Sequence, residues 1–206
     1  MKMKTQINKK SKQGGFTLVE IAIVLVIIGL ILGGVLQGQT MIENARYKNF
    51  VREIDSYRAA FHTFRDMQRA LPGDMTAARA QATLNPAATG GNGAGTIGGG
   101  ICNANNDESC RVWSHLRYAE LIPGDPTVIG AASRPNHAYG GLVSGMETSN
   151  AGNTVTENKL RILTVPGEVA QRYDSEFDDG NSASGSISRI TGATWGTTNV
   201  NMAVKL

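Results

Sequence analysis

The sequence has 206 residues, of which 41% are hydrophobic and 18% are charged, values that suit one folded domain with an additional segment. Its formal net charge of +3 arises from the first 15 residues, which contain five lysines and no acid. The remainder has 15 basic and 17 acidic side chains, a net charge of −2. The sequence pI of about 8.9 therefore gives no support for nucleic-acid binding. Lysines beside an apolar segment instead hold that end of a chain in the cytoplasm.

An apolar run from Phe16 to Leu36 follows the basic residues and contains a single acid, Glu20. As a helix rising about 1.5 Å per residue, it is long enough to cross a bilayer core of about 30 Å. A charged side chain at the centre of a bilayer costs about 2.5 to 3.5 kcal/mol, so its presence there indicates a function. A secretory signal peptide would be cut on the far side of its apolar core, whereas here Gly14 and Gly15 precede the run. An ordinary signal anchor is the plain alternative.

The segment 15–20, GFTLVE, resembles the processing signature of type IV pilins and of type II secretion pseudopilins. The similarity in motif covers about residues 10–40, and beyond them it is one of architecture only. The resemblance implies that a prepilin peptidase cuts after Gly15 and methylates the new N-terminus, Phe16. It also implies that Glu20 helps to register each subunit in a filament.

The helical pattern continues beyond the apolar run, because no proline occurs between Phe16 and Ala70 and aromatic or aliphatic residues recur at spacings of 3 and 4. This stripe, which we expect to be core, consists of Tyr47, Phe50, Ile54, Tyr57, Phe61 and Phe64. The segment 71–74, LPGD, should stop the helix. Within the apolar run, small residues four apart allow close helix approach in lipid: Gly29 with Gly33, and Gly34 with Gly38.

These patterns predict four parts. They are a cleaved leader (1–15), a transmembrane or filament-core helix (16–38), an amphipathic half of the same helix (39–71) and a globular head (72–206).

Within the head, the segment 90–100 has seven glycines and little to bury, and we expect an exposed, mobile loop. It is no phosphate-binding loop, since no Gly-Lys-Ser/Thr follows it. Cys102 and Cys110 are close in sequence, and the head should lie outside the cytoplasm, where disulfides persist. We therefore expect a disulfide that closes a surface loop.

The remaining pattern predicts short helices followed by strands. The helices are expected at Thr76–Leu84, Arg111–Ile122 and 167–174, and the strands at Ala138–Ser144, Lys159–Val165, Ser186–Thr191 and Asn199–Leu206. A long N-terminal helix packed on a small antiparallel sheet is an α+β fold. It is also the architecture that the pilin resemblance implies.

Three acids close to one another, Asp174, Asp178 and Asp179, form a candidate calcium site, because Ca²⁺ takes several oxygen ligands. The segment resembles the Asp-x3-Asp-Asp-Gly segments, followed by a strand, of many pseudopilin-like heads, which favours the pseudopilin alternative. The alternative is an acidic turn in water, stabilised by its own backbone. Calcium is the one cofactor considered, and otherwise none is expected.

No catalytic motif is present in the sequence, and we expect a protein that is not an enzyme. The leading hypothesis is a major or minor subunit of a type IV pilus, which first sits in the bacterial inner membrane with its N-terminus in the cytoplasm. Its expected partners are prepilin peptidase, the inner-membrane assembly machinery and further pilin subunits in an extracellular filament. One alternative is a type II secretion pseudopilin in a periplasmic pseudopilus, and another is a membrane-anchored extracytoplasmic binding module that never polymerises.

Overall fold

The computed structural model describes residues 15–149, 157–190, 192 and 194–206. The chain divides into two compact units, 1–44 and 45–206, and each is described by itself. Helix α1, Leu18–Gln68, is the only helix in the described part of the first unit, and its C-terminal part belongs to the second. The leader residues 1–14 lie outside the described residues.

Helix α1 ends at Gln68, three positions before the predicted stop at 71–74. Arg69 adopts a left-handed backbone with φ of +50°, and its N–H still donates to the carbonyl of Arg65 at 2.8 Å. A residue in this conformation closes the last helical turn and redirects the chain. The helix therefore stops before Pro72 could interrupt it.

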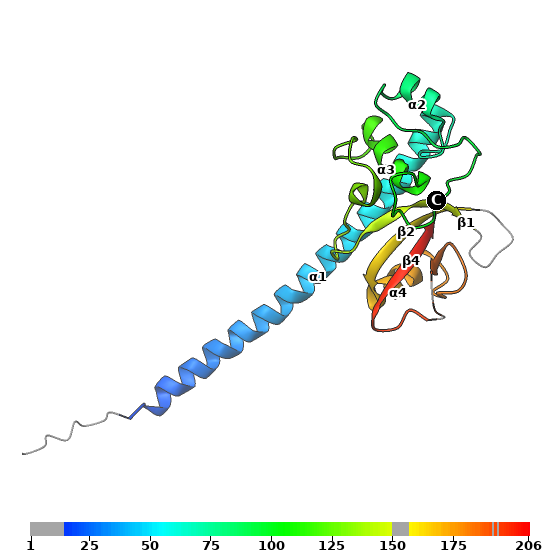
Figure 1. Cartoon of the computed structure of the whole chain (residues 1–206). Helices are drawn as coiled ribbons and strands as arrows, with labels where there is room; N and C mark the ends of the chain where they lie inside the picture. Colours follow the sequence, from blue (N-terminus) through cyan, green and yellow to red (C-terminus); the bar gives the residue numbers. More distant parts are fainter. Residues whose placement is uncertain (1–14, 150–156, 191, 193) are drawn as a thin grey trace, which may run out of the picture. The chain divides into compact units, whose positions relative to one another are not determined.

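The second unit contains a four-stranded sheet whose neighbouring strands are all antiparallel, in the order β1-β2-β4-β3 (Figure 1). Its strands are β1 (Val143–Ser149), β2 (Glu157–Pro166), β3 (Ile187–Arg189) and β4 (Asn199–Lys205). Three of the predicted strands are confirmed to within a few residues. The prediction of a strand at 138–144 is mostly wrong, since β1 begins at Val143. The residues before it form a turn in which the N–H of His137 donates to the carbonyl of Gly141 at 2.9 Å.

Three short helices and one 3-10 turn complete the second unit. They are α2 (Ala77–Thr83), α3 (Glu108–Tyr118), η1 (Gly130–Ser133) and α4 (Gly167–Phe177). Helix α3 lies against β1, where a Cβ on Gly145 would come within 2.8 Å of the carbonyl oxygen of Ser109. It was predicted at 111–122, and it ends earlier because Glu120 has φ of +58°.

The aromatic stripe of α1 is the centre of the core, as the sequence predicts. Phe50 meets the ring of Tyr173 on α4 edge-on, with the two centroids 5.8 Å apart. Further along, Tyr57 meets Trp113 of α3 edge-on at 5.3 Å. The same hydrophobic cluster includes sheet residues such as Leu160. The fold is thus an α+β fold with a long N-terminal helix and a small antiparallel sheet.

The glycine-rich segment 90–100 is largely exposed, as predicted, but two buried carboxylates anchor it, which contradicts the predicted mobility. Asp74 accepts backbone N–H groups of Ala94 and Gly95, both at 2.9 Å. Glu108 accepts those of Asn92 and Gly98, at 2.8 and 2.7 Å. The two acids lie 10 to 21 positions from the N–H groups that they bind, so the glycine count alone could not reveal these bonds.

Close packing adds to this anchoring. A Cβ on Gly91 would lie 2.3 Å from the carbonyl oxygen of Gly73 and 2.7 Å from Cα of Asp74. Ile97, within the same segment, is buried in the core. The segment is therefore packed against the backbone of residues 73 and 74, and it adds one apolar side chain to the core.

His115 joins two loops from within the core. Its Nδ1 accepts the N–H of Gly73 at 2.9 Å, and its Nε2 lies 2.6 Å from the carbonyl oxygen of Thr89. These partners require a neutral ring with the proton on Nε2. Burial accordingly lowers the pKa of His115.

Candidate processing and assembly site

Gly15 and Phe16 lie outside the helix, in the short stretch that precedes α1. Phe16 is 85% exposed. A Cβ built on Gly15 would meet no atom within 4 Å, so nothing in the described part of this chain requires a glycine there. An exposed, non-helical peptide bond is the kind of backbone that a peptidase can bind.

Thr17 and Glu20 form a reciprocal capping box at the start of α1. The Thr17 N–H donates to Oε2 of Glu20 at 2.8 Å, and the Thr17 hydroxyl donates to the same oxygen at 2.9 Å. In return, the N–H of Glu20 donates to Oγ1 of Thr17 at 3.2 Å. The Thr-x-x-Glu spacing is a known helix-start signal, and it satisfies two backbone N–H groups that a helix leaves open.

This capping box leaves part of the carboxylate available. Both hydrogen bonds to Glu20 end on Oε2, and within the described residues none reaches Oε1. Glu20 is therefore held in one orientation at the N-terminal end of the apolar run, with one oxygen able to accept a further donor.

The apolar part of α1 has no burying partner within the described chain. Its most apolar 18-residue window has a mean hydropathy of 2.9 and is 0% buried, so by length and composition the helix could cross a membrane. Its glycines also face open space, since no Cβ built on any of them meets an atom within 4 Å: Gly29, Gly33, Gly34 and Gly38. Such a surface needs lipid or other apolar helices around it.

The three predicted calcium ligands come together at the end of α4. One carboxylate oxygen each from Asp174, Asp178 and Asp179 lie within 4.8 Å of one another. The backbone explains this, because Asp178 follows the last helical residue and the N–H of Asp178 donates to the carbonyl of Asp174 at 2.7 Å.

Each of these acids also has a role in the local structure. Asp178 Oδ2 accepts the N–H of Ile187 at 2.7 Å, which fixes the start of β3. Asp179 accepts the N–H of Asn181 at 2.8 Å and the hydroxyl of Ser184 at 2.7 Å. The acidic turn of the alternative interpretation is therefore present.

Asp174 differs from its two neighbours because it is fully buried. Its Oδ2 accepts the indole N–H of Trp195 at 2.9 Å, whereas its Oδ1 is buried with no hydrogen-bond partner within the described chain. Burial raises the pKa of Asp174, and the nearby charges of Asp178 and Asp179 add to the rise, against the lowering effect of the Trp195 bond. Trp195 lies 21 positions after Asp174, and no local pattern in the sequence connects it with this cluster.

Cys102 and Cys110 form the predicted disulfide, and both are buried. The loop that they close therefore begins and ends in the core.

Residues 10–36 match the family model described as the prokaryotic N-terminal methylation motif. The searches of curated proteins and of solved structures gave no significant match. The chain carries the prepilin signal that type IV pilins and pseudopilins share, and the long apolar helix that follows fits that signal. Such a signal implies processing by prepilin peptidase and assembly with other pilin subunits.

Proposed function

We propose that this chain is a structural subunit of a type IV pilus, major or minor, and that it has no enzymatic activity. The observation that carries this proposal is the methylation motif at residues 10–36, followed by an unpartnered apolar helix with a single acid. The precursor sits in the inner membrane with its N-terminus in the cytoplasm. Cleavage after Gly15 then frees the amino group of Phe16, which is methylated.

The free N-terminus explains why an acid is kept in the apolar run. The ammonium of Phe16 and the carboxylate of Glu20 are each costly in lipid, and each can compensate the other. Oε1 of Glu20 has no hydrogen bond within the described residues, which leaves it to accept the ammonium of a neighbouring subunit. Thr17 holds the carboxylate in place for that contact.

Substitution of Glu20 tests this pairing in the native host. We expect Glu20→Ala to be inserted and cleaved normally but to be absent from sheared filaments. Asp66→Ala, which removes an exposed acid elsewhere on α1, is the matched control and should assemble. Normal filaments from Glu20→Ala would refute the pairing.

Substitution of Gly15 tests processing separately from assembly. Because the fold leaves room for a side chain there, Gly15→Leu should fold and insert like the wild type. We expect it to remain uncleaved, with the 15-residue leader attached, as mass spectrometry of the membrane fraction would show. Cleavage at the wild-type position would contradict the assigned site.

Two other assignments make different predictions for the assembled protein. A type II secretion pseudopilin would be required for secretion and would give no long surface fibre, and an anchored module would stay in the membrane fraction. Electron microscopy of sheared surface material, labelled with an antibody against the head, separates these cases. Labelled fibres support the pilus subunit, and label confined to membranes contradicts it.

We also propose that the head binds calcium at Asp174, Asp178 and Asp179. The unpartnered buried Oδ1 of Asp174 favours this, because a buried carboxylate oxygen without a donor is costly and a cation would satisfy it. When bound, the ion would join the end of α4 to the turn that leads to β3.

Calorimetric titration of the full chain in neutral detergent tests the calcium proposal. Calcium should release or take up heat and should raise the unfolding temperature, and Asp179→Ala should remove both effects. Asp125→Ala, which removes an exposed turn acid bonded to Thr127, should leave both effects unchanged. No heat and no change in unfolding temperature with calcium would rule the site out.

A further inference from the structure

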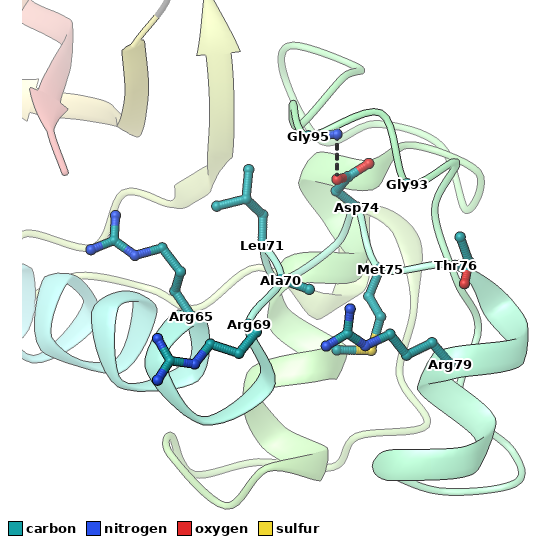
Figure 2. Close-up of a pocket in the computed structure, with 10 residues that line it drawn as sticks. All are labelled: Arg65, Arg69, Ala70, Leu71, Asp74, Met75, Thr76, Arg79, Gly93 and Gly95. Carbon is teal, nitrogen blue, oxygen red and sulfur yellow. Dashed lines mark hydrogen bonds between the residues drawn. The ribbon is translucent and has the colours of Figure 1, made fainter.

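A cavity of about 440 Å³ lies where α1 ends and α2 begins, within the unit 45–206. Its volume falls in the range of about 300 to 1,000 Å³ that is usual for small-molecule sites. Three of its lining side chains are arginines: Arg65 from the last turn of α1, Arg69 just after it, and Arg79 from α2. Figure 2 shows Arg79 extending from α2 toward the end of α1.

The cavity carries an excess of positive charge. Its one acidic lining residue, Asp74, is only 4% exposed and accepts the backbone N–H groups of Ala94 and Gly95. Figure 2 shows the bond to Gly95. In the described part of the chain, no carboxylate forms an ion pair with any of the three arginines. Arg79 donates to the backbone carbonyl of Gln68, a neutral group that leaves its charge uncompensated.

The backbone of Arg69 determines where its side chain lies. Its φ of +50° lies in the left-handed region, which favours glycine or asparagine at the end of a helix. Glycine would serve the turn better, yet the position holds an arginine whose side chain lines the cavity. The left-handed conformation that ends α1 thus also places the Arg69 side chain in the lining of the cavity.

We propose that this cavity binds a small organic anion through its carboxylate or phosphate group. Guanidinium groups bind both kinds of oxyanion with paired hydrogen bonds, and a concave cationic site attracts anions over a distance. Leu71 and Met75 supply an apolar wall for the uncharged body of the ligand, and Thr76 adds a hydroxyl. Every lining residue belongs to the unit 45–206, so the proposed binding does not involve the apolar part of α1 before residue 45.

Isothermal titration of the full chain, in uncharged detergent free of sugar, tests the proposal with three related probes. Glucose 6-phosphate and glucuronate carry a phosphate and a carboxylate on similar rings, and glucose carries neither. We expect binding of at least one charged probe, none of glucose, and weaker binding at higher salt. Binding of only one charged probe identifies which oxyanion the site takes.

Arginine variants locate the site. Arg65→Gln and Arg69→Gln should each weaken binding at least tenfold. Arg58→Gln removes the same charge from α1 outside the cavity and should have no such effect. Thermal unfolding of each variant checks that the fold is intact. Arg65→Gln is a safer test than a change of Arg79, because the Arg79 side chain bonds to the carbonyl of Gln68 at the end of α1.

Three results would overturn the proposal. The first is no binding of either charged probe at about 10 mM, where a site with a Kd of about 1 mM would be nearly saturated. The second is equal binding of glucose. The third is an equal loss of binding in Arg58→Gln, which would show a general effect of charge and no site.

Discussion

Thr17 and Glu20 bond to each other in both directions at the first turn of α1, with Thr17 N–H to Glu20 Oε2 at 2.8 Å and Glu20 N–H to Thr17 Oγ1 at 3.2 Å. The acid that stands out in the apolar run is therefore also the residue that starts the helix. One side chain serves the local structure and, in the proposed filament, the contact between subunits.

Removal of the Thr17 hydroxyl should weaken both of these roles. We expect Thr17→Ala to lower the stability of the helix start by about 1 kcal/mol, as for other lost caps. Faster amide hydrogen exchange at residues 18–21 in micelles would report this, together with fewer sheared filaments. Thr17→Ser keeps the hydroxyl and should behave like the wild type. Unchanged exchange in Thr17→Ala would show that the capping box contributes nothing.

The bond between Trp195 and Asp174 should stabilise the head measurably. Trp195→Phe removes the side-chain donor to a buried carboxylate, and we expect a loss of about 1 to 3 kcal/mol in urea unfolding. In an Asp174→Ala background the same substitution should cost clearly less, because the acceptor is already gone. Equal costs in the two backgrounds would mean that the two side chains are not coupled.

The head should lose stability in mild acid because of two buried histidines. Burial lowers the pKa of both His115 and His137, so the unfolded state binds protons more readily than the folded state. The stability that the two neutral histidines contribute is therefore complete above about pH 6.5, the pKa of histidine in the unfolded chain. It is lost as the pH falls from there through the lower pKa of the folded state. Urea unfolding at neutral and mildly acidic pH, followed by tryptophan fluorescence, measures it.

Histidine variants assign this pH dependence to its source. The double variant His115→Gln, His137→Gln should be less stable at neutral pH but should lose less stability on acidification. His62→Gln, which changes a partly exposed ring with no hydrogen bond among the described residues, should keep the wild-type pH dependence. An unchanged slope in the double variant would place the acid sensitivity elsewhere.

Two glycines of the anchored segment should differ sharply in their tolerance of alanine. In Gly91→Ala the new methyl group would meet backbone atoms of residues 73 and 74, and we expect a loss of about 3 kcal/mol or more, at the upper end for overpacking. Gly95→Ala has open space and only its φ of +80° to accommodate, at a cost of about 1 kcal/mol. Urea midpoints compare the two, and similar losses would mean that residue 91 is not tightly packed.

Periodicity in the sequence predicted most of the helical framework. The stripe from Tyr47 to Phe64 predicted the buried face of α1, because apolar residues spaced three or four positions apart lie on the same side of a helix. The strand predicted at 138–144 begins only at Val143, because apolar residues alone do not show that the backbone folds back on itself between His137 and Gly141.

What the sequence alone determined is the N-terminal segment, from the basic leader through Glu20 to the end of the apolar run. Its signal is local, because the cleavage motif, the acid and the apolar run follow one another directly in the sequence. No folding is needed to bring them together. The tertiary structure alone decided the remote contacts: Asp74 and Glu108 on the glycine-rich segment, Trp195 on Asp174, and three arginines around one cavity. Such contacts join residues far apart in the chain, and their geometry exists only once the core has brought the elements together.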